Sequence, residues 1–476
     1  MSTRPIRFGT DGWRGVIGDD VTFDAVRHVA AGIAEHLTER GGTVAVVGYD
    51  RRFASEVFAE EVARVLAGRG IRALLFDDAA PTQVASWTVI ERGAAGGAVV
   101  TASHNPYLFN GVKYKPETGS SAPPEVIADL ERRINAALDA EVTRAARDDS
   151  RISRIDPRPG YLRQLARMVD LAALREAGLR VLHDPMHGSG AGYVAAALAG
   201  GPTTVTEIRG ERNPFFGGVN PEPIPPNIDA TLEAMHEGVH DLAILTDGDA
   251  DRVGIVDETG RFLTTLELYA LLLRYLVEVR RWRGPIVRSI NMTAMADRLA
   301  ARYQLPLHEV PIGFKSIAPK MIEVDAILGG EESGGYAIRG HIPERDGILV
   351  GLLMVDYIRQ SGRPLSALLQ DLHETAGDSA YLRHDVHLPR DTYDEDRARI
   401  LRTLSENSPA SVAGQRVRSV RDDDGYKFNL EDGSWVLLRA SGTEPVVRVY
   451  SEAESLAGVE ARLRALEDIV GIEQHG

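Results

Sequence analysis

The chain has 476 residues, 43% of them hydrophobic, contains no cysteine, and carries a formal net charge of −15 at pH 7. This length allows three or four domains. The lack of cysteine excludes disulfides and thiolate metal sites, and the acidic balance disfavours nucleic acid and anionic membranes as partners, although one positive cleft could still bind a small anion. No apolar stretch is long enough to cross a membrane, and the N-terminal MSTRPIRFGT lacks the apolar segment of a signal peptide, so we expect a cytoplasmic protein.

Short apolar strands alternate with amphipathic helices up to about residue 370. One helical face, for example, carries Phe23, Val26, Ala30, Ile33 and Leu37. Short apolar runs predict strands at 43–48, 71–76, 98–102, 179–184, 242–246, 285–290 and 326–330. Strands that alternate with helices are typical of α/β layers with largely parallel sheets.

The order changes from about residue 371, where strands dominate. Strands are predicted at 381–388, 415–420, 426–430, 434–440 and 446–453, with helices at 394–405 and 455–469. This pattern indicates a smaller α+β domain. Upstream, a charged stretch at 143–159 separates a first unit from a second, and the segment 209–229, rich in Pro, Gly and Asn, predicts a long ordered loop.

A cluster of small polar residues follows the predicted strand 98–102, from Thr101 to Pro106, and we call it the serine loop. Ser103 and His104 would lie at the carboxyl end of a strand, where α/β sheets bind ligands. The alternative is an Asn-Pro turn with only local hydrogen bonds. An acyl-transfer serine is disfavoured, because Ser103 lacks the G-x-S-x-G elbow.

Three carboxylates alternate in the metal loop, residues 247–252, at Asp247, Asp249 and Asp251. Oxygen ligands at this spacing suit one hard cation such as Mg²⁺ or Ca²⁺. An EF-hand is excluded, because Arg252 occupies the position that needs glycine and the flanks are predicted strands. A solvated acidic turn is the alternative. Arg252 beside the aspartates indicates that the site also meets a phosphate.

Two further loops carry polar groups between glycines or strands. In the glutamate loop, residues 331–335, Glu331, Glu332 and Ser333 could accept hydrogen bonds from sugar hydroxyls, although a plain glycine-rich turn is the alternative. In the arginine loop, residues 439–445, a phosphate cradle could be formed by Arg439, Ser441, Gly442 and Thr443, although an ordinary hairpin loop is the alternative. Taken together, the four loops predict phosphoryl transfer on a sugar phosphate.

Lysine is rare in this chain, with five positions (113, 115, 315, 320 and 427) among 54 basic residues. An ammonium is compact and can lose its proton, whereas a guanidinium is a permanent, forked cation. Lys113 lies shortly after the serine loop and Lys315 shortly before the glutamate loop. Both therefore join the candidate site, Lys113 as a group that could exchange a proton.

The stretches FGTDGWRG (8–15), TASHNP, DGDADR, GEESGG and RASGTEP, in this order, resemble the α-D-phosphohexomutase family of phosphoglucomutases and phosphomannomutases. The resemblance implies a heart-shaped molecule around a central cleft, with three related α/β domains of mixed, largely parallel sheets and a C-terminal α+β domain similar to the TATA-binding protein. The implied domains are 1–150 with the serine loop, 151–258 with the metal loop, 259–370 with the glutamate loop and 371–476 with the arginine loop.

The resemblance also implies roles for individual residues. Ser103 would carry the phosphoryl group, His104 would assist it, and Arg14 and Lys113 would lie near the reacting oxygens. One Mg²⁺ per site would be held by Ser103, Asp247, Asp249 and Asp251. The substrate, a small sugar phosphate, would contact Arg252, Lys315, Glu331, Ser333, Arg439, Ser441, Gly442, Thr443 and Arg448. A hexose 1,6-bisphosphate would be both intermediate and activator, and the protein would be a monomer or weak dimer without nucleic-acid or membrane partners.

The choice of sugar rests on the glutamate loop. GEES is similar to the glucomutases of the family, whereas dual glucose/mannose enzymes resemble GEMSGH and glucosamine mutases GEQSGH, with histidine where this chain has Gly335. We therefore expect glucose 1-phosphate and glucose 6-phosphate to be interconverted. Phosphomannomutase or dual activity is the alternative, and phosphoglucosamine mutase a remoter one. A phosphatase with Asp247 or Asp249 as nucleophile would leave the glutamate and arginine loops unexplained. A sugar-phosphate binding protein on an inactive scaffold is disfavoured, because every motif position is chemically competent.

Overall fold

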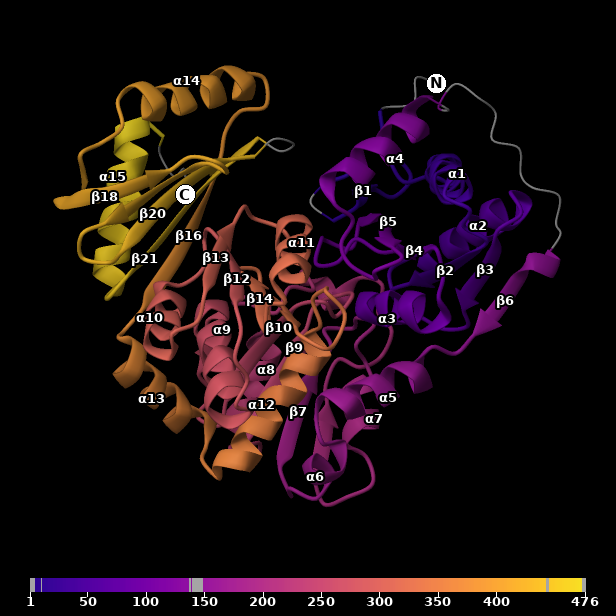
Figure 1. Ribbon diagram of the computed structural model, residues 1–476, viewed down its shortest axis with the longest axis horizontal. Coiled ribbons are helices and arrows are strands. Elements are labelled where there is room, and N and C mark those ends of the chain that lie inside the picture. The colour runs from indigo at the N-terminus through magenta and orange to yellow at the C-terminus, as the bar shows by residue number, and fades with distance from the viewer. Residues whose placement is uncertain (1–4, 10, 137, 139–148, 442–444, 473–476) are drawn as a thin grey trace.

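The computed structural model describes residues 5–9, 11–136, 138, 149–441 and 445–472 (Figure 1). Every strand and helix predicted above is present, with bounds that differ by at most two residues. No helix in these ranges is long and apolar enough to cross a membrane.

The first sheet is mixed and lies at the right of Figure 1. Its order is β1 (Trp13–Val16), β5 (Phe109–Pro116), β4 (Gly96–Val100), β2 (Val44–Tyr49), β3 (Arg72–Phe76) and β6 (Ile152–Ile155). The helices of this part are α1 (Phe23–Glu39), α2 (Ser55–Gly68), α3 (Thr82–Arg92) and α4 (Pro124–Ala136), followed by the 3₁₀ turn Asp149–Arg151. Helix α3 packs on β2 and β4, and its N-terminus points toward the second domain.

The second sheet has the order β11 (Phe262–Leu263), β10 (Val253–Asp257), β9 (Leu242–Thr246), β7 (Arg180–Asp184) and β8 (Thr204–Glu207). Its helical elements are α5 (Arg158–Met168), α6 (Leu171–Arg175), α7 (Tyr193–Leu198), the 3₁₀ turn Phe216–Gly218 and α8 (Asp229–His236). The predicted loop 209–229 contains only that short turn, so its ordered but irregular character is confirmed.

The third sheet has the order β13 (Leu307–Val310), β12 (Ile286–Ser289), β14 (Leu328–Glu331) and β15 (Gly335–Ile338). Its helices are α9 (Thr265–Arg274) with the π-turn Tyr275–Val279, α10 (Ala294–Tyr303), α11 (Phe314–Val324), α12 (Gly347–Ser361) and α13 (Leu365–Ala376). One continuous buried cluster, from Ile6 to Ala376, runs through all three sheets, so these domains share a core.

The three sheets repeat one unit of four strands. In each, two parallel pairings are followed by one antiparallel pairing: β3-β2-β4-β5, β8-β7-β9-β10 and β13-β12-β14-β15. The antiparallel partner is reached through a hairpin, and these three hairpins are the serine loop, the metal loop and the glutamate loop. The three related α/β domains are confirmed, and each places its chemistry at the same point of the repeat.

The fourth domain has a fully antiparallel sheet with the order β16 (Ala380–His387), β21 (Val446–Ala453), β20 (Trp435–Ala440), β19 (Tyr426–Leu430), β18 (Gln415–Arg421) and β17 (Ser411–Val412). Helices α14 (Tyr393–Glu406) and α15 (Leu456–Val470) complete it. A separate buried cluster, from Val386 to Ile472, forms its core. The α+β assignment of this region is therefore confirmed.

Candidate active site

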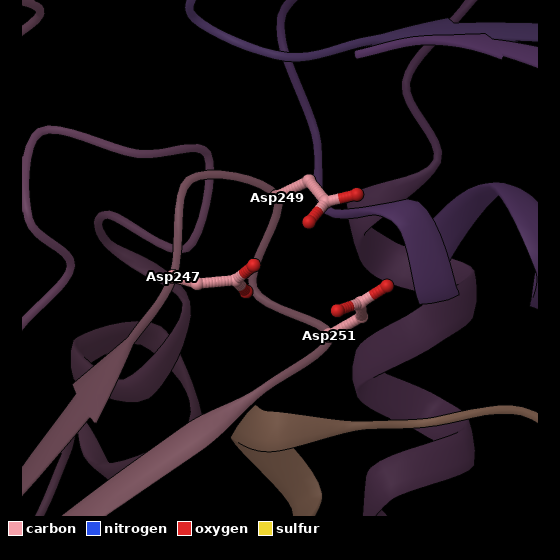
Figure 2. A group of neighbouring side chains, drawn as sticks. All are labelled: Asp247, Asp249 and Asp251. Atoms are coloured by element: carbon pink, nitrogen blue, oxygen red, sulfur yellow. The ribbon is translucent and has the colours of Figure 1, made fainter. Parts of the chain in front are cut away.

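The metal loop connects β9 to β10 and gathers its three aspartates on one turn (Figure 2). Asp247, Asp249 and Asp251 are fully buried, and one carboxylate oxygen from each lies within 4.8 Å of the others. Oδ1 of Asp249 and Oδ1 of Asp251 are buried without a hydrogen-bond partner. Buried carboxylate oxygens need a partner, so these two orphaned atoms fit a hard divalent cation such as Mg²⁺.

The pKa values of Asp247 and Asp249 are shifted in opposite directions by their surroundings. Burial raises the pKa of Asp247, and the neighbouring carboxylates of Asp249 and Asp251 raise it further. Burial alone would also raise the pKa of Asp249, but the Lys113 ammonium, 2.8 Å from Asp249 Oδ2, lowers it. A cation bound between the aspartates would relieve their mutual repulsion.

Ser103 presents its hydroxyl directly to the metal loop. Ser103 Oγ donates to Asp247 Oδ2 at 2.9 Å and lies 3.4 Å from His104 Nδ1. The residue has a left-handed backbone (φ 53°), and its N–H donates to Thr101 Oγ1. On the other side, an ideal Cβ at Gly248 would lie 2.4 Å from the Ser103 carbonyl oxygen, so only glycine lets the two loops approach this closely.

Two residues that the sequence analysis missed hold the serine loop in place. Arg52 is fully buried and donates to the carbonyl oxygens of Ser103, Asn105, Pro106 and Phe109. Asp50 lies 3.2 Å from Arg52 Nε and accepts hydrogen bonds from the hydroxyls of Thr101 and Ser55. The ion pair therefore fixes the backbone of the serine loop, because the Arg52 guanidinium donates to four carbonyl oxygens in the loop and directly after it.

Lys113 lies on β5 and is buried among carboxylates. Its Nζ is 2.7 Å from Asp11 Oδ2 and 2.8 Å from both Asp249 Oδ2 and Asp251 Oδ2. Burial alone would lower the pKa of Lys113, but these three carboxylates raise it. The arrangement therefore favours a fixed positive charge at Lys113 over the proton-exchanging amine that the sequence analysis expected.

Arg345, which the sequence analysis did not identify, joins the metal loop to the glutamate loop. Its Nη2 lies 2.8 Å from Asp251 Oδ2 and also contacts Asp11, and its Nη1 donates to Glu331 Oε1 at 3.0 Å. Nε contacts Glu344, which in turn accepts from Lys115. Residues from three domains thus share one buried network of alternating charges.

The glutamate loop places its two carboxylates in different directions. Glu331 accepts from Arg345 and from the Ser333 hydroxyl, which is 2.7 Å away. Glu332 accepts from the Tyr381 hydroxyl at 2.7 Å, and its Oε1 lies 3.7 Å from Arg383 Nη1, so it connects the loop to β16 of the fourth domain.

The remaining predicted cations surround this group. Arg14 on β1 donates to Asn105 of the serine loop at 2.7 Å, and Arg252 donates to Glu222 of the long loop at 2.9 Å. Lys315 lies half-buried in the first turn of α11. Burial lowers the pKa of the His104 imidazole, as do the cations Arg252, Arg14, Arg52 and Lys113 around it.

The arginine loop belongs to the β20–β21 hairpin. Arg439 and Arg448 are cross-strand partners there, and Arg439 Nε donates to Asp424 at 2.8 Å. The Ser441 carbonyl accepts from the Tyr393 hydroxyl. Gly442 and Thr443 lie outside the described residues. Arg448 is linked to the glutamate loop through Asp385, Arg383 and Glu332.

The first prediction concerns the metal loop. Asp249→Asn keeps the volume but removes one negative charge from the cation site, so Mg²⁺ should bind about tenfold more weakly. Isothermal titration of Mg²⁺ measures this directly. Asp241→Asn, which changes an aspartate of the same domain that pairs with Arg180 at the surface, is the matched control. Equal Mg²⁺ affinity in both variants would contradict the assignment.

The second prediction concerns Arg345. Arg345→Met would leave the buried Glu331 without its cation and remove one of the cations of Asp11 and Asp251, which keep Lys113, at a cost of about 3–5 kcal/mol of stability. The apparent melting temperature should fall clearly below that of Arg363→Met, because Arg363 forms a largely exposed pair with Asp371. Equal melting temperatures for the two variants would show that the network does not hold the domains.

Comparison with known proteins identifies this arrangement. Family models of phosphoglucomutase/phosphomannomutase match along the chain: α/β/α domain I at 5–141, domain II at 159–260, domain III at 266–376 and the C-terminal domain at 400–468. A phosphoglucosamine mutase of Rubrobacter xylanophilus is 30% identical over 98% of this chain and 97% of its own. A phosphoglucomutase/phosphomannomutase of Thermococcus kodakarensis is 27% identical over 94% of both chains.

The solved structures agree with the sequence relatives. A crystal structure from Thermus thermophilus, of a protein classed with the phosphomannomutases, is 36% identical, has a TM-score of 0.86, and covers 98% of this chain and 100% of that one. The four matched domain models follow one another along the chain in the order of the family's domains. The chain belongs to the phosphoglucomutase/phosphomannomutase family and is a phosphohexomutase, an isomerase of carbohydrate metabolism.

Proposed function

We propose that this enzyme interconverts glucose 1-phosphate and glucose 6-phosphate through a phosphorylated Ser103 and a glucose 1,6-bisphosphate intermediate. The observation that carries the proposal is the 2.9 Å approach of Ser103 Oγ to Asp247, which aims a hydroxyl from one domain at the cation site of another. A structural serine would have no need of this contact with a loop in which Asp249 Oδ1 and Asp251 Oδ1 are orphaned.

The transfer itself needs charge neutralisation more than covalent assistance, because the transition state of phosphoryl transfer is loose. In the forward step the bond between phosphorus and Ser103 Oγ breaks and a bond to the sugar hydroxyl forms. The hydroxyl proton leaves to a base, for which His104 is placed beside Ser103 Oγ. Arg14 on β1 and Lys113 on the adjacent strand β5 would supply positive charge near the oxygens of the transferring phosphoryl group.

The cation fits this scheme as a resident group. One Mg²⁺, held by Asp247, Asp249, Asp251 and the oxygen carried by Ser103, would neutralise charge on the transferring phosphoryl group. The return step requires the bisphosphate to present its other phosphate to Ser103. Two phosphate positions are therefore needed, and the arginine loop would hold the one that is not reacting, through Arg439, Ser441, Gly442, Thr443 and Arg448. Arg252 and Lys315 would contact the same substrate.

The ion pairs of the glutamate loop favour glucose as the sugar in our proposal. Glu331 pairs with Arg345 and Glu332 lies near Arg383, so both carboxylates have a cation before any ligand arrives. Such a loop suits the neutral hydroxyls of glucose, held by Glu331 and Ser333, better than the ammonium of glucosamine. The same arginine accounts for the glycine at position 335. An ideal Cβ at Gly335 would lie 2.1 Å from Arg345 Cδ, so the histidine that other members have there would displace Arg345.

Phosphoglucosamine mutase is the second candidate, because relatives of that name match almost the whole chain. Mannose 1-phosphate remains a substrate in our proposal, since Glu331 and Ser333 would hold the 3- and 4-hydroxyls that glucose and mannose share. It is the weaker one, because the two sugars differ in the orientation of the 2-hydroxyl, to which one polar group can be matched. We further propose that the bisphosphate primes Ser103 as an activator, and that the enzyme works in the cytoplasm as a monomer or weak dimer.

The third prediction tests the phosphoryl carrier. Ser103→Ala should fold normally but lose mutase turnover by several orders of magnitude, because covalent catalysis has no replacement for its nucleophile. Intact-mass measurement should show a phosphoryl-sized increment in the parent enzyme that is absent from this variant. Ser120→Ala, at a buried serine that bonds Thr118, is the matched control. A variant as active as the parent, or net release of phosphate in place of isomerisation, would refute the proposal.

The fourth prediction tests the sugar. We expect kcat/KM for glucose 1-phosphate to exceed that for mannose 1-phosphate by roughly ten- to a hundredfold, since one matched hydroxyl contact contributes about 1–3 kcal/mol. Glucosamine 1-phosphate should be poorer than glucose 1-phosphate as well. Initial rates with Mg²⁺ and the matching bisphosphate measure all three. A higher value for glucosamine 1-phosphate would replace glucose in the proposal and leave the role of Ser103 standing.

A further inference from the structure

A cavity of about 440 Å³ lies where the first three domains meet, and none of its residues belongs to the candidate active site. Its walls come from α3, from α5, from the turn after the π-helical segment and from the turn after β15. The lining residues are Trp87, Gln164, Arg167, Met168, Arg280, Trp282, Arg339 and Gly340. This volume is within the range of small-molecule sites.

The cavity is positive although the protein is acidic. Three arginines line it and no carboxylate does, in a chain whose net charge is −15. Arg280 donates to the Met168 carbonyl, and the carboxylate that Arg339 contacts, at 3.3 Å, belongs to the highly exposed Asp325. Arg167 is exposed, and its side chain forms no ion pair with the residues that the structure describes. Three guanidiniums without a buried counter-charge attract an anion, and phosphate matches their forked geometry.

Two indoles provide the other half of the cavity. His341 stacks on Trp87 with ring centroids 6.2 Å apart and an interplanar angle of 22°, so one face of Trp87 is covered. Trp87 Nε1 is buried and finds no acceptor in the part of the chain that the structure describes. Arg280 and Arg339 lie 5.2 and 5.4 Å from the ring centroid of Trp282. Trp87 and Trp282 both line the cavity, so it offers aromatic surface beside its guanidiniums.

We propose that this cavity is a second ligand site, which binds a nucleoside diphosphate. The flat base would stack on the Trp87 indole, and the phosphates would pair with Arg167, Arg280 and Arg339. A free phosphate would use the arginines but not the indoles, and an uncharged nucleoside would use only the indoles. The proposal is independent of the sugar on which the mutase acts.

Calorimetric titration of the 476-residue chain with ADP tests the proposal. ADP should bind saturably and more tightly than either pyrophosphate or adenosine. Arg167→Ala and Arg339→Ala should each weaken ADP binding by about tenfold. Arg163→Ala, at an arginine one turn earlier on α5 that pairs with Glu91, should bind ADP like the parent. All three variants should retain mutase activity, and Trp87→Phe should reduce the change in tryptophan fluorescence on ADP addition.

Several results would overturn the proposal. One is the lack of saturable binding up to about 1 mM ADP. A second is binding that Arg439→Ala abolishes but Arg167→Ala leaves intact, because ADP would then occupy the arginine loop of the mutase centre. A third is equal affinity for pyrophosphate, which would reduce the site to a phosphate site, and a fourth is equal affinity for adenosine, which would remove the anion from the assignment.

Discussion

The structure depends most on the pairing of buried charges where the first three domains meet. Carboxylates of Asp11, Asp249, Asp251, Glu331 and Glu344 lie against Lys113, Lys115 and Arg345, all of them nearly or fully buried. Burying such groups is costly unless every charge is paired with good geometry. The domains must therefore meet in one orientation, and that orientation is the one that brings the serine, metal and glutamate loops together.

The loops that carry the reacting residues are held in place by hydrogen bonds from buried side chains outside those loops. Asp50 and Arg52 hold the backbone of the serine loop, and Thr82, the first residue of α3, donates to Asp249. Gln83 adds a hydrogen bond to the Ala250 carbonyl of the metal loop. These side chains touch neither metal nor substrate in our proposal, but they remove the freedom of the loops that do, which is what precise positioning for phosphoryl transfer requires.

Local signals in the sequence were sufficient for much of this picture. Apolar runs such as 242–246 predicted strands because burial and β-branched residues coincide there, and the loops were found because polar residues interrupt those runs. Strand β5, FNGVKYKP, was not predicted, since two lysines and a glycine disguise a largely buried strand. Arg345, Asp50 and Arg52 were missed for another reason: besides their short-range contacts, each has a partner 50 to more than 300 positions away, and such long-range contacts leave no local pattern.

The repeated four-strand unit has a consequence for how this architecture acquires chemistry. Each functional loop closes a hairpin at the end of a unit whose parallel strands are held by the shared core. A hairpin loop of fixed length and turn type can change in sequence while its two flanking strands keep their register, since loop length, turn type and the buried pattern of the strands set that register. Ser103 and the three aspartates thus lie in such loops, whereas Arg14, Lys113, Arg439 and Arg448 lie on strands. In our proposal the same four-strand unit therefore carries a phosphoryl group in the first domain, a cation in the second and a sugar in the third, through different residues in one corresponding loop.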